Sequence, residues 1–431
     1  MSEKKKIAFH TLGCKLNFSE TSAISRKSDE EGYINVGFDQ VADIYVINSC
    51  SVTKRAEKRC KTLVKKVLKT NPHAQIAVVG CYSQINPDEI KSISGVDLVL
   101  GNTDKFSLFE HLKPVDPSNN KENALELTAT QPEVFIPSYS IDDRTRSFFK
   151  IQDGCDYFCS YCTVPLARGR SRSNSIAQTL TTATEIAKTN IKEVVLSGVN
   201  IGDFGRKNGE SLYGFLQEFV KIDGIERIRI SSVEPDLLHD DIIELVAQSA
   251  KLMPHFHIPL QSGSDEVLKA MGRRYDTQLF RSRVAKIKQL MPQACIAVDI
   301  IAGFPSETDA LFYKSLEFLR DTPISYIHVF TYSERENTLA NKYSLQIPPA
   351  ERNRRSKLIQ ELSDMKRGVF YNSNIGFNTE VLWEKDNLDG LMHGFTSNYI
   401  KVKRKFDIQR VNTIERIRLE TIDSDGLFMV K

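Results

Sequence analysis

The sequence lacks both a long hydrophobic run and a large net charge. No segment reaches the roughly 18 consecutive apolar residues of a membrane-spanning helix. The first residues, Met-Ser-Glu-Lys-Lys-Lys, lack the apolar region of a secretory signal peptide. We therefore expect a cytoplasmic protein that does not contact a membrane. A net charge of +3 excludes a strongly basic chain, so any nucleic-acid role must rest on local basic patches.

The length of 431 residues is enough for several domains rather than one. Residues 1–115 alternate short apolar strands with helical stretches, and the clearest strands are Lys6–Thr11, Asp43–Asn48 and Gln75–Gly80. This pattern predicts an N-terminal α/β domain with an open parallel sheet. Residues 116–143 are rich in proline and polar side chains and predict a linker.

A second alternation runs through residues 144–350. Its six candidate strands are Ser147–Gln152, Glu193–Ser197, Arg227–Ser231, His255–Leu260, Ile296–Ile301 and Tyr326–Tyr332. Six strand–helix units in a row predict a central partial (β/α)6 barrel with its active site at the carboxyl ends of the strands. Residues 351–371 predict a basic linking helix. Residues 372–431 alternate short strands with Asp, Asn and Gly turns, which predicts a small C-terminal β-barrel.

Eight cysteines in a cytoplasmic chain are unsuited to a disulfide framework. Cys155, Cys159 and Cys162 follow the first strand of the predicted barrel with C-x3-C-x2-C spacing, and three thiolates on one loop can ligate one metal centre. A closed zinc site needs a fourth ligand, and no other Cys or His lies nearby in the sequence. Three thiolates on a 4Fe–4S cube instead leave one iron free. The alternatives are a zinc site with a distant fourth ligand, or a Cys159–Cys162 redox pair, which would leave Cys155 unexplained.

Cys14, Cys50 and Cys81 are far apart in the sequence, yet each directly follows an apolar strand. The carboxyl ends of parallel strands share one edge of a sheet, so we expect these thiols to converge on one centre. The alternative is three buried cysteines without a ligand. A second cluster with an open iron could carry the sulfur that a sulfur-inserting enzyme needs. We interpret Cys60 and Cys295 as structural.

The spacing of the second-domain cysteines, with Tyr161 before the last one, resembles the radical-SAM signature. The resemblance implies that the free iron binds S-adenosylmethionine and that the reduced cluster splits it into a 5′-deoxyadenosyl radical. Small and polar residues at the ends of the predicted barrel strands fit contacts to this cofactor, with Gly303 giving the backbone access to its adenine. The candidate cofactor contacts are Tyr161, Ser197, Gly198, Asn200, Ser231, Glu234, Gln261, Ser262, Asp299 and Gly303.

The whole chain resembles the methylthiotransferase family. The resemblance rests on Thr11–Ser19, the three dispersed cysteines, the Gly154-Cys155 loop, Arg168-Gly169-Arg170, the stretch from His328 to Ser333, and a final barrel similar to a TRAM domain. Residues 148–155 and 168–173 resemble the threonylcarbamoyl branch. This implies a catalytic set of Cys14, Cys50, Cys81, Cys155, Cys159 and Cys162 on two 4Fe–4S clusters. One S-adenosylmethionine would methylate a cluster-bound sulfur, and a second would yield the radical that takes hydrogen from C2 of N6-threonylcarbamoyladenosine at tRNA position 37.

Alternatives to this function are the isopentenyladenosine and ribosomal-protein branches of the family, a non-catalytic iron–sulfur RNA-binding protein, and a zinc-binding structural protein. The resemblance also implies a sulfur donor, an electron donor such as flavodoxin or ferredoxin, and the anticodon stem-loop of tRNA as substrate. We expect a monomer.

Basic residues cluster in three places that could meet RNA phosphates. One is the helix near Thr53–Lys69, and the other two supply the candidate RNA contacts Arg168, Arg170, Arg172, Lys401, Lys403 and Arg404. We favour the arginines, since they lie closest to the predicted chemistry, and Arg168 could also pair with the carboxylate of a threonylcarbamoyl group. The alternative for each basic run is an ordinary solvated face.

Overall fold

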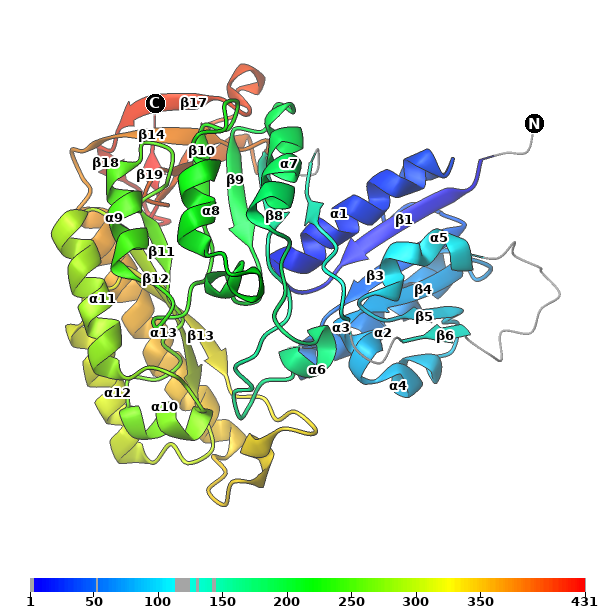
Figure 1. Cartoon of the computed structure of the whole chain (residues 1–431), viewed down its shortest axis with the longest axis horizontal. Coiled ribbons are helices and arrows are strands. Elements are labelled where there is room, and N and C mark those ends of the chain that lie inside the picture. The colour runs from blue at the N-terminus through cyan, green and yellow to red at the C-terminus, as the bar shows by residue number, and fades with distance from the viewer. Residues whose placement is uncertain (1–3, 52, 113–124, 129–131, 142–144, 431) are drawn as a thin grey trace. The chain divides into compact units, whose positions relative to one another are not determined.

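The computed structural model describes residues 4–51, 53–112, 125–128, 132–141 and 145–430 (Figure 1). The chain forms two compact units. The first comprises residues 1–140, 148–156 and 162–172, and the second comprises residues 141–147, 157–161 and 173–431. No helix in the described part of the chain is both long enough and apolar enough to cross a bilayer.

The first unit is built on a six-stranded sheet in which every pairing is parallel. Its order is β2-β1-β3-β4-β5-β6. One apolar layer packs α2 against one face of the sheet, and a second layer, which includes Ile24 of α1 and Leu108 of α5, covers the other. The predicted open parallel α/β sheet is confirmed. Its strands are β1 (Lys6–Thr11), β2 (Ile34–Val36), β3 (Ile44–Ser49), β4 (Gln75–Gly80), β5 (Leu98–Leu100) and β6 (Leu125–Leu127).

The helices of this unit are α1 (Lys15–Glu30), α2 (Lys54–Thr70), α3 (Cys81–Ile85), α4 (Pro87–Lys91), α5 (Leu108–His111) and α6 (Val164–Arg168). The helix α2 begins where the Thr53 side chain accepts a hydrogen bond from the Ala56 amide. Its buried residues Cys60, Leu63, Val64 and Val67 follow the spacing of one helical face. In α1, by contrast, most buried residues are polar, and that polar face carries part of the site described below.

The region predicted as a linker contains two short strands. β6 extends the first sheet, and β7 (Ser138–Tyr139) pairs antiparallel with the second half of β8 (Arg146–Lys150). Residues 116–124, 129–131 and 142–143 of the predicted linker lie outside the described residues. Proline and polar residues hid both strands because each strand is only two or three residues long.

Five of the six strands predicted for the partial barrel lie in the second unit, and the remaining one, β8, has only its first two residues there. β9 (Glu193–Ser197) lies between β8 and β10 (Arg227–Ile230), and β11 (His255–His257), β12 (Cys295–Ala302) and β13 (Tyr326–Thr331) form a parallel trio. A parallel bridge from Ser232 to His257 connects the two groups. The helices run outside the strands (Figure 1) and are α7 (Ile176–Ala187), α8 (Leu212–Phe219), α9 (Asp240–Gln248), α10 (Asp265–Met271), α11 (Thr277–Leu290), α12 (Asp309–Asp321) and α13 (Pro349–Asn372).

The predicted C-terminal barrel is a curled six-stranded sheet around Trp383, with the order β17-β14-β15-β16-β19-β18. It packs on the amino ends of the barrel strands, where Arg227 and Arg229 of β10 donate hydrogen bonds to the carbonyl oxygens of Phe395 and Ser397. The strands are β14 (Asn378–Trp383), β15 (Leu391–Thr396), β16 (Lys401–Lys405), β17 (Ile414–Arg418), β18 (Thr421–Ile422) and β19 (Phe428–Met429).

Candidate functional site

The first-unit cysteines lie at the carboxyl ends of three neighbouring strands. Cys14 caps α1 just after β1, Cys50 directly follows β3, and Cys81 begins α3 directly after β4. In register, Thr11 lies opposite Asn48 and Ser49 lies opposite Gly80, so the three strands end together. None of these three cysteines forms a disulfide.

The backbone beside Cys14 approaches Cys50 closely. Gly13 has φ +101°, and a Cβ built on it would lie 2.8 Å from Cys50 Sγ. Only glycine combines this dihedral angle with the space available. The glycine before Cys14 therefore lets the backbone there approach Cys50, as a centre shared by the two cysteines requires.

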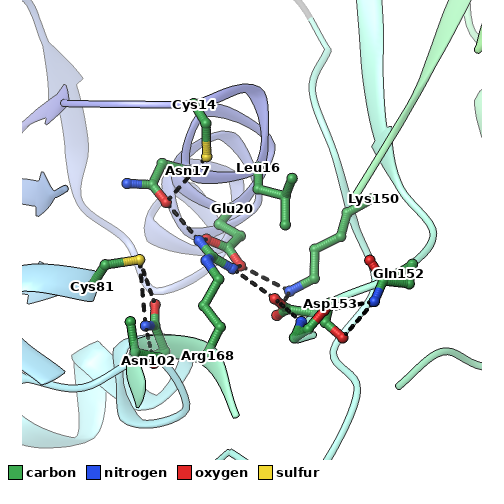
Figure 2. A network of polar contacts seen from close by, with 12 residues as sticks. Cys14, Leu16, Asn17, Glu20, Cys81, Asn102, Lys150, Gln152, Asp153 and Arg168 are labelled. Carbon is green, nitrogen blue, oxygen red and sulfur yellow. Dashed lines mark hydrogen bonds and ion pairs between the residues drawn. The ribbon is translucent and has the colours of Figure 1, made fainter. Parts of the chain in front are cut away.

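Beside these cysteines, Glu20 is the hub of a buried ion-pair network (Figure 2). Its carboxylate is 1% exposed and accepts hydrogen bonds from Lys105 Nζ at 2.6 Å, Lys150 Nζ at 2.8 Å and Arg168 at 3.0 Å. Burial alone would raise the pKa of Glu20, but the three cations hold it well below its usual value. The carboxylate is therefore ionised in the folded protein.

Asp153 is the second carboxylate of the network. It lies 2.9 Å from Lys150 Nζ, 3.0 Å from Arg168 and 3.1 Å from Arg172. Its pKa is also lowered, because Lys150 and Arg168 together outweigh the effect of burial. Arg168 thus joins both carboxylates and is itself only 3% exposed.

Two asparagines lie between this network and the thiols (Figure 2). Arg168 donates to Asn17 Oδ1 at 2.6 Å, and the same oxygen lies 3.9 Å from Cys14 Sγ. Asn102 Nδ2 lies 3.6 Å from Cys81 Sγ and donates to the carbonyl oxygen of Ala167 at 2.7 Å. Through these contacts α6, which begins two residues after Cys162, is tied to the edge that carries Cys14 and Cys81.

The network has more positive than negative charge. Four cations, Lys105, Lys150, Arg168 and Arg172, face two carboxylates, Glu20 and Asp153. Burial lowers the pKa of Lys105 and of Arg172, so this excess of cations is unfavourable unless an anion compensates it. An iron–sulfur cube held by three thiolates is net anionic, so the charge of the surroundings and the three cysteines both fit such a group at this edge.

The second set of cysteines lies on the loop that follows β8. In the first unit, the Cys155 amide donates to the Gly169 carbonyl oxygen at 3.1 Å, and the Val164 amide donates to Cys162 Sγ at 3.4 Å. In the second unit, Arg273 Nη1 donates to Cys159 Sγ at 3.0 Å. Arg273 also pairs with Glu234. Burial raises the pKa of Cys159, and the Arg273 contact opposes this by favouring the thiolate form that an iron ligand must take.

Most predicted cofactor contacts lie at the carboxyl ends of the barrel strands. Ser197 ends β9, Ser231 follows β10, and Gln261 and Ser262 lie beyond β11. Gly198 and Asn200 follow Ser197, and the Tyr161 ring packs edge-on against Phe304, beyond β12. Asp299 differs, because it lies in the middle of β12 and pairs with His257 at 2.7 Å.

Two of these residues have partners that the sequence does not reveal. Gly303 has φ +76°, and a Cβ there would lie 2.4 Å from Cγ of Arg352, so the packing of Arg352 is enough to explain the glycine without access to an adenine. Glu234 is held by Arg273, a residue that sequence reasoning missed. No motif points to Arg273, which follows the Gly272 cap of α10.

Comparison with known proteins agrees with this architecture. Residues 6–101 match the uncharacterized protein family UPF0004, and residues 149–319 match the radical SAM superfamily. The threonylcarbamoyladenosine tRNA methylthiotransferase MtaB of Bacillus subtilis is 35% identical over 96% of this chain and 93% of its own length. The MtaB of Thermotoga maritima is 34% identical over 98% of this chain and 96% of its own length. The chain belongs to the MtaB family of radical-SAM tRNA methylthiotransferases.

Members of this family work with S-adenosylmethionine and 4Fe–4S clusters, so the cofactors predicted from the cysteines are confirmed. Among solved structures, the radical S-adenosylmethionine methyltransferase TsrM of Kitasatospora setae superimposes with a TM-score of 0.54. The superposition covers 76% of this chain and 75% of TsrM at 11% identity, and it supports the fold alone.

The residues predicted to contact RNA are mostly engaged within the protein. Arg168 ends α6 and is buried, so its predicted role as an RNA or carboxylate contact does not fit the structure: its guanidinium already binds Glu20, Asp153 and Asn17. Arg172 pairs with Asp153. Only Arg170 of the three is well exposed, at 62% of its side chain.

On the C-terminal sheet, Lys403 is buried and pairs with Asp423 and Asp425, and Arg404 pairs with Glu415 at 3.0 Å. These two predicted RNA contacts therefore have acidic partners already. Lys401 is partly exposed. The most exposed basic surface that the sequence indicated is instead the outer face of α2, formed by Lys54, Arg55, Lys58, Arg59, Lys65 and Lys69.

Proposed function

We propose that this protein transfers a methylthio group to C2 of N6-threonylcarbamoyladenosine at position 37 of tRNA. The observation that carries the proposal is the near-full-length similarity to proteins named for this substrate, at 32–35% identity. Relatives named tRNA-2-methylthio-N(6)-dimethylallyladenosine synthase, including that of Desulfitobacterium hafniense, are 29–30% identical. The two candidate substrates, threonylcarbamoyladenosine and dimethylallyladenosine, thus differ in the side group on the adenosine.

The cysteines divide into two ligand sets in this proposal. Cys14, Cys50 and Cys81 hold one cluster, and Cys155, Cys159 and Cys162 hold the other. When bound, these groups and S-adenosylmethionine supply the radical and sulfur chemistry that acid–base catalysis cannot provide at an aromatic C–H bond. The excess positive charge of the Glu20 network supports the first assignment, and the Arg273 contact to Cys159 supports the second.

The chain's own side chains have positioning tasks. Arg273 orients both Cys159 and Glu234, and the polar residues Ser197, Ser231 and Gln261 at the strand ends are suited to contact the cofactor. Inside the barrel, His257, Asp299 and His328 have ligand atoms within 4.8 Å of one another on neighbouring strands. Within this cluster, His257 and Asp299 supply hydrogen-bonding groups for a heterocyclic substrate in the barrel.

The remaining parts of the proposal concern organisation and partners. Residues 1–115 and 144–350 form the two cluster-binding domains on either side of a linker, 116–143. The helix at 351–371 leads to an RNA-binding domain at 372–431. The basic face of α2 and Arg170 contact tRNA phosphates. The enzyme works as a cytoplasmic monomer with separate electron and sulfur donors.

The test is anaerobic reconstitution followed by iron and sulfide analysis, and mass spectrometry of nucleosides from tRNA incubated with the enzyme. We expect about eight irons per chain from two 4Fe–4S clusters, and about four when either cysteine set is replaced by alanine. The matched control is Cys60→Ala, because this thiol lies in the apolar core on the buried face of α2, where burial raises its pKa to about 12. Loss of iron in the control, or a dimethylallyl product alone, would contradict the proposal.

A further inference from the structure

A pocket of about 460 Å³ lies in the second unit, beside β13. Residues of β13 form one wall, α13 forms another, and the C-terminal sheet closes it with Phe395, Tyr399 and Lys401. We call it the β13 pocket. Its volume falls within the range of about 300–1,000 Å³ that is typical of small-molecule sites. Among the described residues that line it, none is acidic.

The β13 pocket offers an aromatic surface that no other ring covers. Phe330 is 46% exposed, and among the described residues its ring has no aromatic or cationic partner. The exposed part of this ring leaves apolar surface in water, and burial of that surface under a second ring is favourable. A flat, apolar ring of this kind is a stacking surface for a nucleobase.

The two cations that line the pocket, Arg367 and Lys401, differ in whether they form an ion pair. Arg367 is exposed and pairs with Asp364 at 3.0 Å, and Asp364 also accepts a hydrogen bond from Gln360. Lys401, in contrast, makes no ion pair within the described part of the chain, although its backbone amide donates to the hydroxyl of Tyr371 at 3.0 Å. Its ammonium group is therefore available to an anion.

The walls around Lys401 are rigid. The ring of Tyr399 stacks on Phe395 at 4.7 Å and lies 4.4 Å from the ring of His255, with the guanidinium of Arg229 4.7 Å from its centre. Tyr399 also has φ +68°, a strained value for a tyrosine that persists only where surrounding contacts enforce it. A preorganised site loses less conformational entropy when a ligand binds.

We propose that the β13 pocket binds one unpaired nucleotide of the tRNA other than the adenosine that reacts. Its base stacks on Phe330 and its phosphate pairs with Lys401. The inference rests on the proposed tRNA substrate and adds a second contact to it. The pocket differs from the site of the second cysteine set because it runs along β13 between α13 and the C-terminal sheet, and Cys159, Arg273 and Glu234 are not among its lining residues.

The test measures the affinity of the reconstituted enzyme for a labelled anticodon stem-loop at several salt concentrations. Phe330→Ala should weaken binding by about 5- to 150-fold and leave the salt dependence unchanged, since stacking involves no counterion release. Lys401→Ala should weaken binding and reduce the slope of log affinity against log salt by about 0.7, the value for one phosphate contact to a single strand. Phe330→Tyr should keep most of the affinity.

Matched controls are Met365→Ala, on α13 but outside the pocket, and Lys314→Ala, an exposed lysine on α12. Neither should change RNA affinity. Cleavage of S-adenosylmethionine without RNA should be the same in all variants, which shows that each one is folded and loaded.

A set of stem-loops, each with one abasic loop position, identifies the bound nucleotide. One abasic position should weaken binding to the wild type but cause no further loss in Phe330→Ala. Unchanged affinity in Phe330→Ala, or coupling of Phe330 to the reacting adenosine itself, would overturn the inference. A failure of the proposed function would be recognised separately, from the nucleosides that the wild-type enzyme produces.

Discussion

Removing the acidic hub of the buried network should cost more stability than removing its arginine. The two perturbations are Glu20→Gln and Arg168→Met, which keep side-chain size while deleting one charge each. After Arg168→Met, Glu20 still has Lys105 and Lys150, and Asp153 still has Lys150 and Arg172. No carboxylate is left without a cation. The main loss is the donor to Asn17, and an unsatisfied buried acceptor costs about 1–3 kcal/mol.

Glu20→Gln has a different consequence because the network already holds excess positive charge. Lys105 loses its carboxylate, and Asp153 alone then faces four buried or partly buried cations. Removing one partner from a buried ion pair costs about 3–5 kcal/mol, because the remaining charge stays buried without compensation. We therefore expect Glu20→Gln to lower the free energy of unfolding by about 2 kcal/mol more than Arg168→Met does.

Urea unfolding of the iron-free protein, followed by far-UV circular dichroism, measures both values. The single tryptophan, Trp383, lies in the C-terminal sheet of the second unit, so its fluorescence transition should move less than the dichroism transition in both variants. In the double variant the two losses should not add, since the side chains contact each other. If Arg168→Met lowered the free energy of unfolding as much as Glu20→Gln, the conclusion that the network has excess positive charge would be refuted.

Two further predictions concern a close backbone contact and a buried carboxylate. Gly13→Ala should remove about half of the reconstituted iron, because the new Cβ would meet Cys50. The control is Gly32→Ala, which is also at positive φ but has nothing within 4 Å of the new Cβ, and it should retain all of the iron. Equal iron in both variants would refute the reasoning. Burial would raise the pKa of Glu193, but Arg229, Arg227 and Arg146 lower this pKa to about 2. The ionised carboxylate should therefore contribute about 3 kcal/mol of stability above pH 4.5, and this contribution is lost as the pH falls towards 2. Urea titrations followed by Trp383 fluorescence between pH 6 and about 3 should show this loss in the wild type and not in Glu193→Gln.

The sequence predicted the strands and the common edge of the first three cysteines because those features depend on local patterns. β1 and β4 have the predicted bounds, and β3 is displaced by one residue. A run of buried apolar residues followed by Cys is visible without knowledge of the fold. No local pattern predicts the strand β15, because its sequence Leu-Met-His-Gly-Phe-Thr neither alternates clearly nor forms an apolar run.

The Glu20 network could not be predicted because its members are far apart in the sequence. Glu20 is 85 residues from Lys105, 130 from Lys150 and 148 from Arg168. Its helix, α1, shows no apolar stripe to mark which face is buried, since that face carries Asn17, Ser19 and Glu20. Read locally, Arg168-Gly169-Arg170-Ser171-Arg172 looks like a solvated basic loop. Only tertiary contacts show that Arg168 and Arg172 neutralise buried carboxylates, whereas Arg170 pairs with Asp156 near the surface.

The formal net charge of +3 therefore says little about how the protein meets RNA. Four of the cations lie in the Glu20 network, where they pair with Glu20 and Asp153 rather than meet solvent. Cations on α2 are exposed because the opposite face of that helix supplies the apolar contacts to the sheet. Attraction to phosphates falls off within about 10 Å at moderate salt, so a local set of exposed cations matters more than the total. The same residue type thus pairs with buried carboxylates inside the protein and presents charge to solvent on α2, and burial separates the two roles.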